Sequence, residues 1–163
     1  MFRSVEGRNN VVTRIGLDGH NRVALSDTNA VEIMSTSPDG RWVTYAGTIG
    51  KEQIGVKAVP VYGGESKILC YNGCRPDWSP DGALLYCRTA FQPAAPALVV
   101  PLEPGRAFPE FPSGSADALS AWRTLPGARM LERPISIPGL DQATYIAIKV
   151  DERRNLFRVP LQR

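Results

Sequence analysis

The chain has 163 residues, of which 43% are hydrophobic and 21% charged, a balance typical of a folded globular protein with one sizeable core. Its 19 basic and 16 acidic residues leave a formal net charge of +3, too mild and too evenly spread to indicate a nucleic-acid-binding protein. No apolar run approaches the roughly 18 residues of a membrane span, and the first residues, MFRSVEGRNN, lack the apolar core of a signal peptide.

Turn-forming residues indicate the fold class. The 15 glycines and 14 prolines lie between short apolar runs without a collagen-like or low-complexity period, as in an all-β protein. In chain order, residues 11–16 and 22–25 predict the first two strands, joined at Asp18-Gly19. The single histidine, His20, follows that turn and is interpreted as an exposed turn residue.

Residues 31–70 predict four strands, at 31–36, 41–46, 55–61 and 66–70. The word Ser37-Pro38-Asp39-Gly40 separates the first two. Proline presets φ for the second position of a type I turn, aspartate suits the third, and glycine accepts the left-handed conformation that follows. We therefore interpret these four residues as a structural turn that closes a hairpin.

Residues 71–112 repeat this pattern, with predicted strands at 75–78, 83–88, 97–102 and about 106–110. The word Ser79-Pro80-Asp81-Gly82 lies 42 residues after the first copy (80 − 38). Asp39 and Asp81 are candidates for a carboxylate pair, but the turn explains both. Equivalent places in neighbouring units would also hold them about one unit apart, too far for an acid–base or metal pair.

Three cysteines, an odd number, do not indicate a disulfide framework. Cys70 and Cys74 flank a Tyr-Asn-Gly turn and could come close. With one histidine in the chain they cannot complete a zinc site. We interpret Cys70, Cys74 and Cys87 as small buried hydrophobic residues at or near a turn.

The last third of the chain departs from the pattern. Residues 113–127 predict an irregular connection with a short helical turn at 117–122. Trp122 in this connection is the candidate surface aromatic, whereas Trp42 and Trp78 lie within predicted strands and are expected in the core. Three further strands are predicted near 128–135, 144–150 and 155–161.

A repeat of about 42 residues with four short strands, apolar on both faces, is typical of β-propeller blades. A sandwich or an ordinary barrel does not need such a repeat. About three blades are fewer than the four to eight of known propellers, so we expect a partial propeller within a larger protein. A truncated reading frame, an alternative start codon and a self-associating half-ring remain as explanations. The predicted units are an incomplete blade (1–30), two blades (31–70 and 71–112), the connection (113–127) and a terminal blade lacking its outer strand (128–163).

The words "SPDGRWVTY" and "PDWSPDGALLYCRT" resemble the Pro-Asp-type repeats of TolB-like, WD-repeat-like bacterial β-propellers. The ending "TYIAIKVDERRNLFRVPL" is similar to the closing blade of a subgroup in which the propeller follows a winged-helix or serine/threonine-kinase domain. The resemblance implies a ring closed by a strand from the other end of the chain. It also implies a parent protein that acts in signalling or regulation.

No hydrolase G-x-S-x-G, P-loop, dinucleotide fingerprint, H-E-x-x-H or EF-hand loop occurs in the sequence. We therefore predict no catalytic residue, cofactor or metal, and a non-catalytic binding or sensing module for an unidentified protein or small ligand. The alternatives are the propeller of a prolyl-oligopeptidase-like peptidase and a TolB-type periplasmic envelope protein. This segment is expected to contact neither nucleic acid nor membrane and to self-associate if its stack of sheets is open. Its compartment depends on sequence upstream.

Overall fold

The computed structural model describes residues 1–6, 9–50, 53–71, 74–89, 96–110, 118–131, 136–139 and 144–147. Within them the protein is all-β, as the sequence predicts, with thirteen strands and one six-residue helix. All the strand pairs are antiparallel. The predicted strand at 155–161 and the first part of the irregular connection, up to residue 117, lie outside the described residues.

The first sheet has the order β1-β2-β3, with β1 (Phe2–Glu6), β2 (Asn9–Arg14) and β3 (Val23–Ala24). The sequence predicted strands at β2 and β3 but not at β1. The turn between β2 and β3 includes Gly19 with φ of 80°, and the His20 amide donates a hydrogen bond to Asp18 Oδ1 at 2.9 Å. His20 is exposed, as expected of a turn residue.

The second sheet has the order β4-β5-β6-β7, with β4 (Ala30–Thr36), β5 (Trp42–Ile49), β6 (Gln53–Pro60) and β7 (Lys67–Tyr71). These strands fall within a few residues of the predicted ranges. The middle of β5 is buried without interruption, because the sheet is covered on both faces. That pattern follows from apolar residues on both sides of one strand.

The third sheet has the order β11-β10-β9-β8, with β8 (Cys74–Trp78), β9 (Leu84–Thr89), β10 (Ala97–Pro101) and β11 (Arg129–Leu131). The predicted fourth strand at 106–110 is wrong, since β11 occupies that edge instead. Residues 102–110 form a loop, hereafter the 102–110 loop, which turns at Gly105 with φ of 78° and buries Phe108. Pro104 and Pro109, which lack amide hydrogens, suit a loop better than a ladder.

The remaining elements are the helix α1 (Ala118–Arg123) and a two-stranded sheet of β12 (Ser136–Pro138) and β13 (Tyr145–Ala147). The helix coincides with the predicted helical turn. It packs against β10 of the third sheet and β7 of the second. The prediction that Trp122 is a surface aromatic is wrong, because Trp122 is fully buried in the core between these sheets. A short amphipathic helix buries its largest apolar side chain in the core. The position of Trp122 in an irregular segment of the sequence does not reveal this burial.

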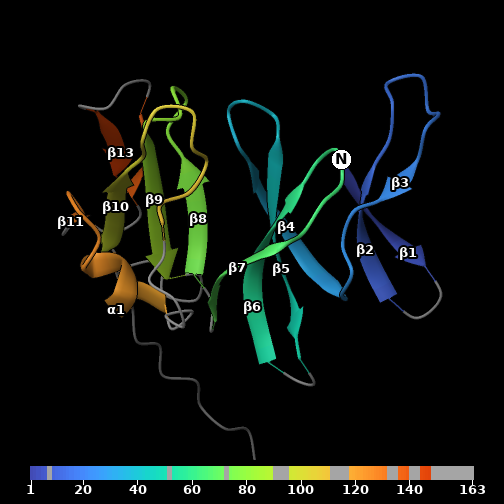
Figure 1. Cartoon of the computed structure of the whole chain (residues 1–163), viewed down its shortest axis with the longest axis horizontal. Helices are drawn as coiled ribbons and strands as arrows, with labels where there is room; N and C mark the ends of the chain where they lie inside the picture. The colour runs from blue at the N-terminus through green and yellow to red at the C-terminus, as the bar shows by residue number, and fades with distance from the viewer. Residues whose placement is uncertain are drawn as a thin grey trace, which may run out of the picture.

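The three larger sheets stand side by side in chain order (Figure 1). Strand β4, the first of its sheet, contacts β1 and β2 on one side and β8, the first strand of the next sheet, on the other. Polar bonds join β4 to β8: Ser35 Oγ donates to the Pro76 carbonyl at 2.8 Å, and Arg75 Nη1 lies 2.8 Å from Glu32 Oε1. One apolar cluster fills the space between the second and third sheets and another lies between the first and second.

Candidate functional site

The first Ser-Pro-Asp-Gly word forms a hairpin turn held by its own side chains. Ser37 Oγ donates to Asp39 Oδ1 at 2.5 Å and accepts from the Trp42 amide at 2.9 Å. Asp39 Oδ1 also accepts from the Arg41 amide at 3.0 Å, and Gly40 has φ of 69°. These bonds to the carboxylate lower the pKa of Asp39, the Ser37 hydroxyl first among them.

The second word repeats this geometry. Ser79 Oγ donates to Asp81 Oδ1 at 2.6 Å and accepts from the Leu84 amide at 2.9 Å. Asp81 Oδ1 accepts from the Ala83 amide at 3.0 Å, and Gly82 has φ of 72°. In each aspartate, therefore, Oδ1 accepts the hydrogen bonds that close its own turn.

The two hairpins lie side by side rather than at separate places on the surface. A Cβ added to Gly82 would lie 3.8 Å from the Pro38 ring. Both turns line one cavity of about 150 Å³, together with Trp78 and part of the 102–110 loop. The hairpins are therefore closer than the expected separation of one unit suggested, and the bonds shown for the two aspartates are those of their own turns.

The 102–110 loop is anchored between the second and third sheets by aromatic contacts. The ring of Phe108 meets Trp42 edge-on at a centroid distance of 5.2 Å and Trp78 at 5.5 Å. Trp78 Nε1 donates to the Ala107 carbonyl at 2.7 Å. These contacts with Trp42 and Trp78 hold the loop against the core, while its polar side chains stay at the surface.

Those polar side chains form an ionic chain centred on Arg106. Its Nε lies 3.0 Å from Glu103 Oε2, and its Nη1 donates to Glu110 Oε1 at 2.5 Å. The side chains are exposed by 48%, 75% and 81% for Arg106, Glu103 and Glu110. Glu110, and to a lesser degree Glu103, raise the pKa of Arg106 above its usual value.

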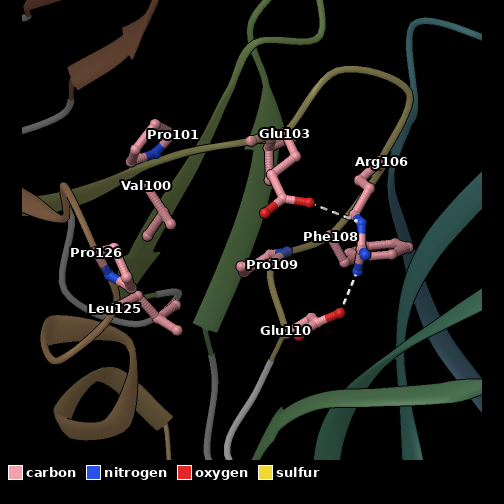
Figure 2. Close-up of a pocket in the computed structure, with 10 residues that line it drawn as sticks. Val100, Pro101, Glu103, Arg106, Phe108, Pro109, Glu110, Leu125 and Pro126 are labelled. Carbon is pink, nitrogen blue, oxygen red and sulfur yellow. Dashed lines mark hydrogen bonds and ion pairs between the residues drawn. The ribbon is translucent and has the colours of Figure 1, made fainter.

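The 102–110 loop separates two larger cavities, and Arg106 lines both of them as well as the small cavity between the hairpins. The first, of about 470 Å³, lies on the α1 side, as Figure 2 shows. The second, of about 660 Å³, lies on the β7 side and is bounded by Trp42, Lys67 and Ile68. Lys67 also lies 5.4 Å from the Trp42 ring centroid, in a cation–π contact. These cavities are the candidate functional site.

Sequence reasoning missed this site, because its parts come from segments with no shared motif. The sequence predicts a strand over residues 106–110, the second half of the loop, and does not predict the ion pairs. The only available signal was the pattern Glu103–Arg106–Glu110, whose spacings of three and four residues allow one arginine to reach both carboxylates.

A second polar group lies between the first and second sheets and was also missed. Lys57, only 8% exposed at its side chain, places Nζ 2.8 Å from Asp27 Oδ1. Tyr45, opposite Lys57 on the neighbouring strand, donates to the same oxygen at 3.4 Å and lies 3.3 Å from Thr28 Oγ1. The Lys57 bond lowers the pKa of Asp27, and burial raises the pKa of Tyr45 to about 12. Tyr45 is therefore a neutral donor at ordinary pH, and the cluster links the β3–β4 connection to the second sheet.

The cysteines depart from the sequence interpretation in one respect. Cys70 in β7 and Cys74 in β8 form a disulfide, with a Cα–Cα distance of 6.2 Å, rather than remaining thiols. All three cysteines are buried, as expected. The disulfide forms because β7 ends and β8 begins within a five-residue span, which the sequence alone left open. Burial raises the pKa of the Cys87 thiol to about 12, so this cysteine is a packing residue rather than a nucleophile.

An ion pair links β8, the strand that contacts β4, to β9. Asp77 of β8 is paired with Arg88 of β9, and both side chains are 19% exposed. Arg88 Nη2 donates to Asp77 Oδ2. The pair lies on the opposite face of β8 from Trp78 and fixes polar side chains beside the β4–β8 junction.

No protein-family model and no curated protein sequence matches this chain. The described residues contain no helix with the length and hydropathy to cross a bilayer.

Proposed function

We propose that this chain is a β-propeller-type module that binds a ligand or partner without catalysing a reaction. One observation carries the proposal: two hairpins 42 residues apart have the same hydrogen bonds and lie side by side against one loop. Sheets that repeat along the chain and meet through their first strands, as β4 and β8 do, are how propeller blades are arranged.

The binding surface we propose is the pair of cavities that flank the 102–110 loop. Cavities of about 470 and 660 Å³ fall within the range of known ligand sites. The charged residues that line them are Glu103, Arg106, Glu110 and Lys67. Arg106 is already paired with the two glutamates, and the set as a whole is suited to recognising a charged ligand. The resemblance to TolB-like repeats associates such a module with bacterial signalling or regulatory proteins.

A blocking substitution tests this assignment. Pro126 is exposed at the rim of the 470 Å³ cavity, and Pro126→Trp would fill it. We would screen the protein by saturation-transfer NMR against small fragments that carry one ammonium, one carboxylate, one phosphate or no charge. We expect at least one class to bind and to be lost in Pro126→Trp. The control is His20→Trp, at an exposed turn that lines none of the three cavities. Binding that survives Pro126→Trp would exclude the 470 Å³ cavity as the site, and no binding by any class would contradict the proposal.

The Cys70–Cys74 disulfide favours a second candidate, a TolB-type module of an extracytoplasmic protein, because disulfides persist in oxidising compartments. The test is alkylation of the cysteines in intact cells of the source, followed by mass spectrometry. We expect Cys70 and Cys74 to be alkylated only after reduction. Three cysteines alkylated in denaturant without reductant would exclude this candidate.

A further inference from the structure

The 470 Å³ cavity has two walls of different chemistry (Figure 2). One wall is apolar and is made by Val100 of β10 with Leu125 and Pro126 from the segment after α1. The facing wall is the ionic chain of Glu103, Arg106 and Glu110. A ligand that fills this cavity therefore needs an apolar body and one polar end.

The ionic wall carries two carboxylates against one guanidinium, a net charge of −1 on a chain whose net charge is +3. Arg106 directs Nε to Glu103 and Nη1 to Glu110. Each carboxylate uses one oxygen for Arg106, and within the described part of the chain its other oxygen accepts no hydrogen bond. The wall thus offers acceptors and negative charge.

An anionic ligand fits this wall poorly. An anion at the remaining donors of the Arg106 guanidinium would lie beside the two carboxylates, a contact between like charges. A cationic donor meets the free oxygen of either carboxylate without breaking an existing ion pair.

We propose that this cavity binds a small molecule with one protonated primary amine on an apolar body. The ammonium contacts the free oxygen of Glu103 or of Glu110, and the apolar body lies against Val100, Leu125 and Pro126. This inference rests on the proposed binding function and names its ligand class.

The test uses n-hexylammonium as the probe, with hexanoate and 1-hexanol as matched probes of opposite charge and no charge. Each is titrated into the ¹⁵N-labelled protein at low ionic strength, and amide shifts are followed. We expect hexylammonium to bind most tightly and to shift amides of the 102–110 loop and of Leu125. Its affinity should fall as salt is added, because exposed charges are screened.

The double variant Glu103→Gln, Glu110→Gln removes the negative charge and keeps the shape. Both side chains are exposed, so the fold should persist, and the amide spectrum checks this. We expect hexylammonium affinity to fall at least about fivefold, the scale of one or two exposed ion pairs. The control is Glu65→Gln, an exposed glutamate that lines none of the three cavities. Unchanged affinity in the double variant would overturn the inference.

The three probes separate this inference from the proposed function. If hexanoate or hexanol binds as tightly as hexylammonium and Pro126→Trp abolishes that binding, the module binds ligands here and the amine class is wrong. If none of the three probes nor any fragment in the wider screen binds, both the inference and the proposed function fail.

Discussion

At the scale of the residue, Gly40 and Gly82 hold the same backbone position in two hairpins, with φ of 69° and 72°. An added Cβ would meet no atom within 4 Å at Gly40 and only the Pro38 ring at Gly82, so space does not exclude larger side chains. The positive φ does, because L-residues are strained there. Conformation, rather than packing, requires glycine at both positions.

Gly40→Val and Gly82→Val should therefore each lower the free energy of unfolding by about 1–2 kcal/mol, since each forces a β-branched residue to positive φ. Urea unfolding followed by tryptophan fluorescence measures this. Gly40→Asn is the matched control, because asparagine tolerates the left-handed region, and it should cost less than valine. Equal costs for asparagine and valine would show that the turn can change its conformation.

The Asp27–Lys57 pair makes a second prediction at this scale. Asp27→Asn removes the carboxylate and leaves a buried ammonium beside a neutral group. We expect a loss of about 1–2 kcal/mol, less than for a fully buried pair, because the Asp27 side chain is 63% exposed and water screens it. The free energy of unfolding of the native protein and of Asp27→Asn, measured at several pH values, gives this difference.

The sign of the pH dependence follows from the pKa of Asp27, which is lower in the folded protein than its usual 3.8. The pair's contribution is complete above that value and is lost as the pH falls through the lowered pKa. The difference between the native protein and Asp27→Asn should therefore be constant at neutral pH and shrink below about pH 4. A difference that stays the same down to pH 2 would contradict the ion pair.

At the scale of the element, the 102–110 loop packs between the second and third sheets. Its buried anchor is Phe108, 7% exposed, which contacts Trp42 and Trp78. Its exposed part is the ionic chain around Arg106, so one segment links the core to the candidate site. The loop's position depends on the anchor.

Phe108→Ala should cost about 3–5 kcal/mol, the usual range for removing a buried phenylalanine. It should also change the fluorescence of Trp42 and Trp78, because their shared neighbour is lost. Phe108→Leu, which keeps most of the apolar volume, should cost markedly less. A cost below about 1 kcal/mol for the alanine variant would mean that the loop is not anchored here.

At the scale of the whole molecule, the second and third sheets are joined by a disulfide, by the β4–β8 contacts and by a shared apolar core. The disulfide closes a loop of only about five residues, and the chain-entropy estimate for such a loop is about 2 kcal/mol. The core, which includes the fully buried Trp122, is therefore the larger contribution to the junction.

The double variant Cys70→Ala/Cys74→Ala should accordingly lose about 2 kcal/mol of unfolding free energy and unfold at a lower temperature. It should keep the β-rich circular dichroism of the native protein. Calorimetry and circular dichroism measure the two quantities. The control is Cys87→Ala, which removes a buried thiol outside the disulfide. Loss of the fold in the double variant would show that the junction depends on the crosslink rather than on the core.

Sequence patterns predicted the all-β class, most strands of the three larger sheets, and the short helix. The reason is local: turn words, β-branched runs and helix formers act on neighbouring residues. They failed at residues 106–110, where a strand-like pattern lost to the burial of Phe108. They predicted a strand near 128–135, where β11 lies, but not that it pairs with β10 from about thirty residues away. They also failed at Trp122, whose burial depends on where α1 packs.

The paired Ser-Pro-Asp-Gly words by themselves determined two hairpin turns, their glycine conformations and the 42-residue repeat, because each turn is closed by bonds within six residues. Only the tertiary structure decided that these hairpins lie side by side, that the 102–110 loop divides two cavities beside them, and that Cys70 meets Cys74. Those outcomes depend on contacts between segments distant in sequence or on the placement of two sheets, for which local conformational preference carries no information.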